Sequence, residues 1–142
     1  RLIKDIRNQD GDENTLIDLF KLEPEINKKL GTLSGGTLQK VNIVLGFLFD
    51  TPVLILDEPT VSLDPVSLTK FKKIISEKKQ QGKIIIYTTH IMSLAEEFSD
   101  KIILLLDGKN IFNGGLKEIL FKSGEESLEN AITYLVDKNG ND

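Results

Sequence analysis

The stretch VLILDEPT, residues 53–60, joins a short apolar run directly to two adjacent carboxylic acids. A continuous apolar run of this kind suits a β-strand that is covered on both faces, as strands of parallel sheets usually are. The run ends abruptly at Asp57 and Glu58. Because open α/β sheets bind ligands at the carboxyl ends of their strands, the two acids mark the end of the strand where we expect function.

Elements on both sides of this strand predict an α/β fold. Upstream, the apolar residues of segment 38–49 indicate a helix buried on most sides. Downstream, Asp64 can cap a helix that has Pro65 at its first position and stops at Gly82. Residues 83–89 then form a second β-rich run. This alternation of strand and helix predicts a parallel sheet with flanking helices.

The rest of the chain adds local elements to this sheet. Residues 91–98 have the apolar spacing of an amphipathic helix. Apolar segments 102–106 and 111–112 flank Asp107-Gly108, a pair suited to the positive φ angles of a tight hairpin turn. Two helices are expected after the hairpin, and residues 1–30 are expected to form short helices.

Composition limits the possible classes of function. The 142 residues are 39% hydrophobic and 28% charged, which is typical of one globular domain. Lys and Arg number 18 against 22 Asp and Glu, so the net charge is -4 and a nucleic-acid partner is not expected. The absence of Cys excludes disulfides and thiolate metal sites, and one His leaves little for a zinc site. No apolar run approaches the roughly 20 residues that span a bilayer, so any membrane contact is expected to go through a partner.

Two glycines stand at the start of the predicted helix of residues 38–49, in the stretch LSGG at residues 33–36. Without Cβ atoms, Gly35 and Gly36 let backbone N–H groups approach an anion at the positive end of a helix. The hydroxyl of Ser34 adds a further donor. The structural alternative is a loop whose glycines serve only a tight turn.

Three titratable residues carry the chemistry at the strand ends. Adjacent residues on a strand point to opposite sides, so one of Asp57 and Glu58 can hold Mg²⁺ while the other orients a water, as phosphoryl transfer requires. His90 ends the second strand and could donate a hydrogen bond to a terminal phosphate. The structural alternatives are two acids that cap a helix and a surface histidine.

Four segments, in this order and spacing, resemble the motifs of ATP-binding cassette ATPases. LSGGTLQK at residues 33–40 resembles their signature motif, and VLILDEPT at residues 53–60 resembles their Walker B strand. SLDP at residues 62–65 looks like their D-loop, and TTH at residues 88–90 looks like the segment of their switch histidine. The resemblance implies a partial P-loop NTPase fold.

The same resemblance divides the chain into two predicted parts and shows that the phosphate-binding motif of the family is missing from it. It assigns residues 1–32 to part of an α-helical subdomain and residues 33–142 to the C-terminal part of a nucleotide-binding domain. Thr37 replaces the family's usual Gln. No G-x-x-x-x-G-K-[ST] stretch occurs in the 142 residues, so the phosphate-binding loop and the glutamine loop are expected upstream of Arg1. The only Met, Met92, is internal, which also favours an upstream segment.

By resemblance, each residue receives a role with ATP and Mg²⁺. Asp57 would help hold Mg²⁺, Glu58 would polarise the attacking water, and His90 would contact the γ-phosphate within the same subunit.

The family works as a head-to-tail dimer of two nucleotide-binding domains. Ser34, Gly35 and Gly36 would therefore bind the γ-phosphate of ATP held by the partner domain, and Asp64 would link the two sites. Without the phosphate-binding loop, the isolated chain is expected neither to bind ATP tightly nor to hydrolyse it. The strand that bears this loop is also missing, so a sheet edge is expected to be open to self-association.

The resemblance implies the ATP-binding subunit of a transporter, peripheral at the cytoplasmic face of the cell membrane and docked on membrane-spanning subunits. One alternative is the C-terminal lobe of a chromosome-structure or DNA-repair ATPase, and another is a non-catalytic module without a phosphate-binding loop. Residues 1–30 show no heptad run and the net charge is acidic, and both features count against the chromosome-type ATPase.

Overall fold

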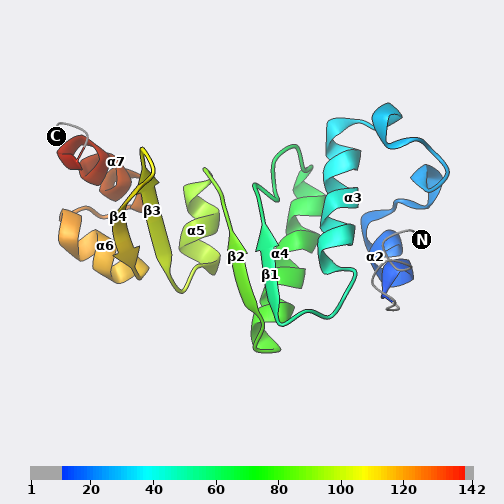
Figure 1. Ribbon diagram of the computed structural model, residues 1–142, viewed down its shortest axis with the longest axis horizontal. Coiled ribbons are helices and arrows are strands. Elements are labelled where there is room, and N and C mark those ends of the chain that lie inside the picture. The colour runs from blue at the N-terminus through cyan, green and yellow to red at the C-terminus, as the bar shows by residue number, and fades with distance from the viewer. Residues whose placement is uncertain (1–10, 140–142) are drawn as a thin grey trace. The chain divides into compact units, whose positions relative to one another are not determined.

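The computed structural model describes residues 11–139, which divide into two compact units between Thr89 and His90. The elements of the first unit are α2 (Glu13–Phe20), η1 (Glu23–Glu25), η2 (Leu30–Thr32), α3 (Gly35–Phe47), β1 (Val53–Leu56), α4 (Pro65–Gln80) and β2 (Ile84–Tyr87) (Figure 1). Those of the second are α5 (Met92–Phe98), β3 (Ile102–Leu106), β4 (Lys109–Gly114), α6 (Leu116–Ser123) and α7 (Leu128–Asn139). This order confirms the predicted alternation of strands and helices.

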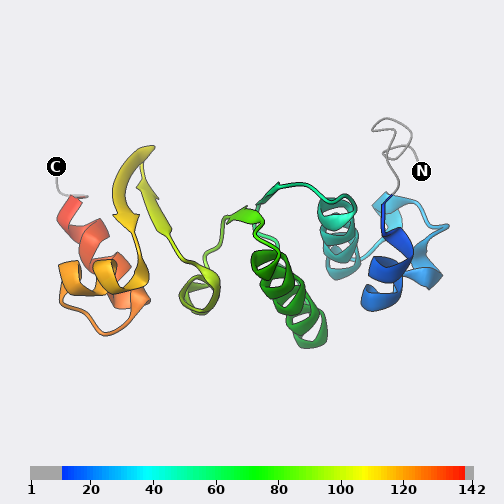
Figure 2. The same ribbon diagram turned by 90° about the horizontal axis from the view of Figure 1, so that it is seen from below.

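In the first unit, β1 and β2 form a parallel pair, with Val53 opposite Ile84 and Leu56 opposite Tyr87. Helices α3 and α4 both lie on the same side of this pair (Figure 2). The rings of Phe47 and Phe71 join the two helices edge to face, with centroids 6.3 Å apart. The predicted parallel sheet with flanking helices is confirmed.

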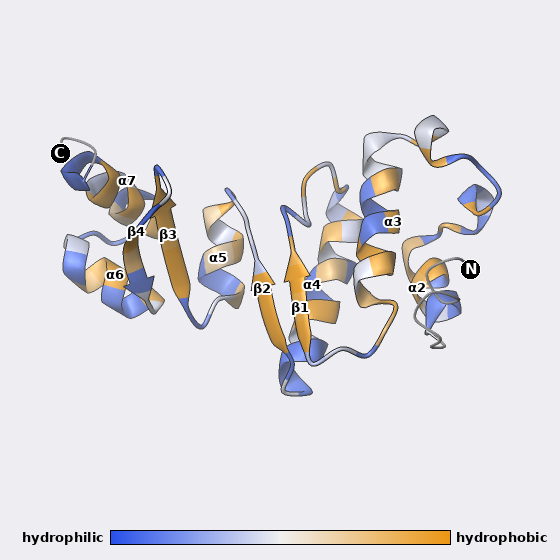
Figure 3. Cartoon of the chain, in the orientation of Figure 1, coloured by the Kyte–Doolittle hydropathy of each residue, from blue (hydrophilic) through white to orange (hydrophobic). Residues whose placement is uncertain are grey.

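The prediction that β1 is covered on both faces is wrong. Its side chains alternate, and only Leu54 and Leu56 are buried. On the opposite face the side chains of Ile55 and Ile84 are 76% and 60% exposed. Because α3 and α4 pack on the same face, no other element within residues 11–89 buries the opposite face, although both strands are hydrophobic (Figure 3).

Helix α3 also departs from its prediction of a helix over residues 38–49, buried on most sides. It begins a turn earlier, at Gly35, because the side chain of Ser34 caps it. Its buried residues, Ile43, Val44 and Phe47, lie on one side only, and Leu45 is exposed.

Helix α4 begins as predicted. The carboxylate of Asp64 accepts a hydrogen bond from the backbone N–H of Ser67 at 2.9 Å, and Pro65 occupies the first helical position. Helix α2 packs against α3 and α4 through a face that includes the buried Leu16 and Phe20. A separate helical subdomain over residues 1–32 stays a prediction, and residues 1–10 lie outside the described residues.

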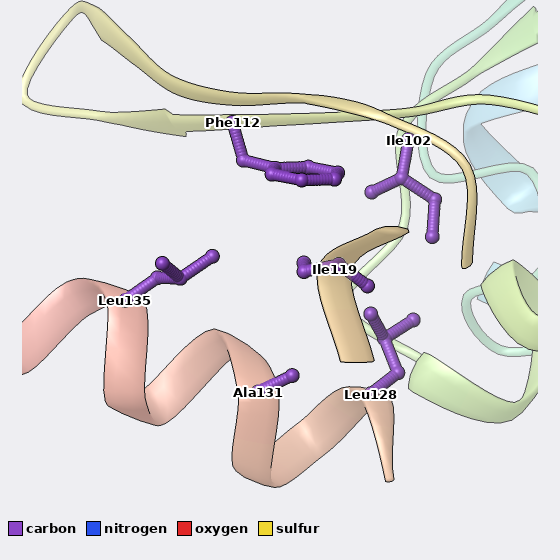
Figure 4. Close-up of a cluster of buried hydrophobic side chains, with 6 residues drawn as sticks. All are labelled: Ile102, Phe112, Ile119, Leu128, Ala131 and Leu135. Carbon is purple, nitrogen blue, oxygen red and sulfur yellow. The ribbon is translucent and has the colours of Figure 1, made fainter. Parts of the chain in front are cut away.

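The second unit has its own core, in which α6 and α7 pack on the β3–β4 hairpin. The buried side chains are Ile102, Phe112, Ile119, Leu128, Ala131 and Leu135 (Figure 4). The predicted hairpin turn is confirmed, since Asp107 and Gly108 have φ angles of 49° and 77°. Both values belong to the turn type that fits the twist of paired strands.

Candidate functional site

The carboxyl ends of β1 and β2 are joined by one threonine. The hydroxyl of Thr88 accepts a hydrogen bond from the backbone N–H of Glu58 at 2.9 Å and donates one to Oδ1 of Asp57 at 2.5 Å. The backbone N–H of Thr88 also donates to the carbonyl of Leu56 at 3.0 Å. Thr88 thus orients the segment that bears both predicted acids.

Residues 57–64, here called the acid loop, have an unusual backbone. Glu58 and Ser62 have φ angles of 42° and 63°, in the left-handed region that residues with a Cβ seldom adopt. Such a conformation costs on the order of 1–3 kcal/mol per residue and persists only where surrounding contacts hold it. The acid loop is therefore a strained segment that its neighbours must restrain.

Helix α3 supplies contacts to this loop from its first two turns. The side-chain amide of Gln39 donates to the carbonyl of Glu58 at 3.1 Å, and Nζ of Lys40 lies 2.7 Å from Oδ2 of Asp64. The backbone also comes close, because a Cβ added to Gly36 would lie 2.8 Å from the carbonyl oxygen of Ser62. The signature segment and the acid loop thus form one contiguous region.

The start of α3 is exposed and capped. Ser34 Oγ accepts from the N–H of Thr37 at 3.2 Å and lies 2.8 Å from the Thr37 hydroxyl. Ser34 and Gly35 are both exposed. The residues predicted to approach an anion therefore stand at a helix N-terminus, where the unpaired N–H groups give a positive potential.

Asp64 accepts hydrogen bonds from three groups. Its pKa is held well below the usual range of an aspartate by the hydrogen bond from Lys40, then by those from the backbone N–H and hydroxyl of Ser67. The residue thus caps α4 and pairs with α3 at the same time. At neutral pH it carries a full negative charge beside α3.

The structure brings most of the predicted residues into one unit. Ser34, Gly36, Asp57, Glu58 and Asp64 all belong to the first unit, on α3 or on the acid loop that contacts it. His90 is exposed and begins the second unit, three residues beyond β2.

Sequence reasoning did not select three residues that the structure adds, namely Gln39, Lys40 and Thr88. Thr88 lies beside Asp57 because it follows Tyr87, the register partner of Leu56, and this register is set by the pairing of the two strands. For Gln39 and Lys40, nothing in the local sequence indicated a contact with the acid loop.

The acids suit a magnesium ion that is held largely by other ligands. Within residues 11–139 there is no cluster of three or more His, Asp or Glu side chains that could hold a metal. Thr88 donates to one oxygen of the exposed Asp57 carboxylate. Because Mg²⁺ usually keeps several waters and takes phosphate oxygens as ligands, one carboxylate is a sufficient protein contribution.

A parallel strand that ends in two acids, beside a glycine-bearing helix N-terminus, is typical of nucleotide-binding ATPases. A family model described as "AAA domain, putative AbiEii toxin, Type IV TA system" matches residues 6–96, and the chain belongs to that family.

Proteins similar to this chain include ATP-binding proteins of ABC transporters. The chain is 33% identical over 114 residues to the uncharacterized ABC transporter ATP-binding protein YhaQ of Bacillus subtilis, and these cover 80% of the chain. It is also 35% identical to the phosphate import ATP-binding protein PstB of Malacoplasma penetrans. This match extends over 112 residues and covers 79% of the chain. A solved structure of an ATP-binding subunit of an ABC transporter matches with a TM-score of 0.80 and 32% identity. That match covers 86% of this chain and 52% of the other.

The resemblance to ATP-binding cassettes read from the motifs is confirmed by these relatives. The chain spans only 38% of the length of YhaQ and 38% of that of PstB. Among the helices of residues 11–139, none has the length and apolarity needed to cross a membrane.

Proposed function

We propose that the protein to which this chain belongs hydrolyses ATP to drive transport across a membrane, and that the chain supplies the signature segment and the water-activating acid. One observation carries the proposal. The acid loop after β1 contacts α3, whose N-terminus bears the glycines, through Gln39 and Lys40. The segment that would contact phosphate and the pair of acids are therefore held together in one unit.

The acids divide the work of the reaction between them. Asp57, oriented by the hydroxyl of Thr88, would hold Mg²⁺, which neutralises charge on the phosphates when bound. Glu58, whose backbone N–H is fixed by the same hydroxyl, would orient the attacking water and accept its proton. His90 would donate a hydrogen bond to the terminal phosphate.

The signature segment would serve a second nucleotide-binding domain. Ser34, Gly35 and Gly36 would contact the γ-phosphate of ATP held by the partner domain, and Asp64 would lie at the junction of the two sites. The exposure of Ser34 and Gly35 at a helix N-terminus supports this role. The phosphate-binding loop would come from outside these 142 residues, so the isolated chain should not turn over ATP.

The names of the similar proteins support a further proposed partner, the membrane-spanning part of a transporter. An ATP-binding subunit of this kind would dock on membrane-spanning transporter subunits at the cytoplasmic face of the cell membrane. The net charge of -4 gives no support to a nucleic-acid partner.

The test is Glu58→Gln in the full-length natural protein, with its partner subunits and Mg-ATP. We expect kcat to fall by about 100-fold or more, because general-base catalysis contributes roughly 10²–10⁴. ATP binding and ATP-dependent dimerisation should persist. The matched control is Glu77→Gln on α4, an acid with a 54% exposed side chain that pairs with Lys73. If Glu58→Gln turns over ATP as fast as Glu77→Gln does, the role of Glu58 is wrong.

A further inference from the structure

We propose that Gln39 and Lys40 are positioning residues that hold the acid loop in its strained conformation and so couple the signature segment to Glu58. The inference rests on the proposed function for its catalytic consequence. The contacts that carry it are independent of that function.

The first step is the strain itself. The left-handed backbone at Glu58 and Ser62 is unfavourable for residues with side chains, so an unrestrained loop would relax. Relaxation at Glu58 would move its carboxylate away from any fixed water position. A misplacement of about 1 Å can cost on the order of 100-fold in rate, even when it starts away from the chemistry.

The second step is what restrains these two residues. The Gln39 amide donates to the carbonyl of Glu58 at 3.1 Å, and the Ser62 carbonyl oxygen is so close to Gly36 that a Cβ added there would lie 2.8 Å from it. The Lys40–Asp64 pair, 2.7 Å long, closes the far end of the loop. Helix α3 therefore contacts both left-handed residues and the last residue of the loop.

The third step is how a movement at the N-terminus of α3 reaches the acid loop. Gln39 and Lys40 lie on the same helix as Gly35 and Gly36, at most five residues along it. A helix moves as a rigid element over so short a distance, because its backbone hydrogen bonds fix each residue to the next turn. Displacement of the helix N-terminus, where partner-held ATP would bind, is therefore transmitted to Glu58 and Asp64.

The test uses the full-length natural protein with its partner subunits. Gln39→Met and Lys40→Met keep the side-chain length and remove the donor or the charge, and Gln39→Glu keeps the shape without the N–H donors. The last variant serves if Gln39→Met does not fold. The rescue variant is Lys40→Arg, and the control is Lys73→Met, whose side chain is 76% exposed on α4.

Two readouts separate positioning from simple stability. We expect kcat to fall by about tenfold in Gln39→Met and Lys40→Met, the equivalent of one lost interaction, while KM for ATP stays within about twofold. Lys40→Arg should recover most of kcat, and Lys73→Met should match the wild type. Without nucleotide, amide hydrogen exchange of residues 57–64 should be about tenfold faster in the two Met variants than in the control.

The outcomes distinguish this inference from the proposed function. If the wild type hydrolyses ATP and both Met variants keep its kcat and its exchange in the acid loop, the positioning role is overturned and the proposed function stands. If the wild type hydrolyses no ATP while the variants still exchange faster in the acid loop, the proposed function falls and the structural restraint stands. A rise in KM alone would overturn the positioning role in favour of a direct contact with ATP.

Discussion

The two faces of the β1–β2 pair are made of the same residue types but have different surroundings. Leu54 and Leu56 are buried beneath α3 and α4, whereas Ile55 and Ile84 are mostly exposed. Large exposed apolar surfaces are rare on soluble monomers and mark places where something else packs. A hydrophobic run in a sequence therefore indicates which side chains favour burial. Only the packing of other elements decides which of them are buried.

The carboxyl end of the same pair differs from the open face. There the polar groups of Thr88, Gln39 and Lys40 reach across from other segments to the acid loop. Other segments thus contact the covered face and the carboxyl end of the pair, whereas none packs on the open face within residues 11–89. This contrast orders the expected effects of substitutions in the chain of residues 1–142.

The largest effect should come from Leu54→Ala on the covered face. We expect it to lower the free energy of unfolding by about 2–5 kcal/mol, because it leaves a cavity beneath two helices. Ile55→Ala on the open face should cost less than about 1 kcal/mol, mostly through strand propensity. Urea unfolding of both variants measures the difference. Equal costs would mean that the open face is covered in solution.

A smaller effect is expected from Gly36→Ala, which brings a Cβ within 2.8 Å of the Ser62 carbonyl. We expect a loss of about 1–3 kcal/mol from forced movement of the helix or the loop. The matched variant is Gly31→Ala, whose Cβ would meet nothing within 4 Å. Thermal unfolding of the pair tests whether α3 touches the acid loop, and identical midpoints would contradict that contact.

The next pair compares two threonines. Thr88→Val removes the hydrogen bonds to Glu58 and Asp57 and should cost about 1 kcal/mol. The hydroxyl of Thr60 is buried without a hydrogen-bond partner within residues 11–139, so Thr60→Val should be neutral or stabilising. Denaturant unfolding measures both, and a greater loss for Thr60→Val would reveal a partner for its hydroxyl.

The smallest effect is electrostatic and depends on pH. The pKa of Asp64 is lowered chiefly by Lys40, and that of Asp50 chiefly by Lys83. A carboxylate with a lowered folded-state pKa stabilises the fold above its unfolded pKa, about 3.9, and this contribution is lost as pH falls towards the folded value. Unfolding free energy should therefore drop below about pH 4.

A charge-neutral variant isolates this contribution. Lys40→Met should show a shallower acid loss than the wild type, because Asp64 then has a pKa nearer its ordinary value. Salt should weaken the effect, since both aspartates are exposed. Unfolding curves measured between pH 2 and pH 7 would contradict this account if the two proteins lose stability in parallel.

Most elements could be predicted from the sequence because their causes are local. Asp64 and Pro65 begin α4, Asp107-Gly108 makes the hairpin turn, and a short apolar run makes β1. The candidate acids Asp57 and Glu58 followed from the same reasoning, because the end of an apolar strand can be read from the run itself.

The contacts that restrain the site could not be predicted in this way. Gln39 lies 19 residues from Glu58, and Thr88 lies 31 residues from Asp57. Whether these groups meet depends on how α3 packs on β1 and on the register of β2, which no local pattern encodes. The left-handed conformation of Glu58 and the exposure of one sheet face also depend on how these elements pack. Periodicity and capping act over a few residues, whereas strain and burial are set by elements that meet only in the folded chain.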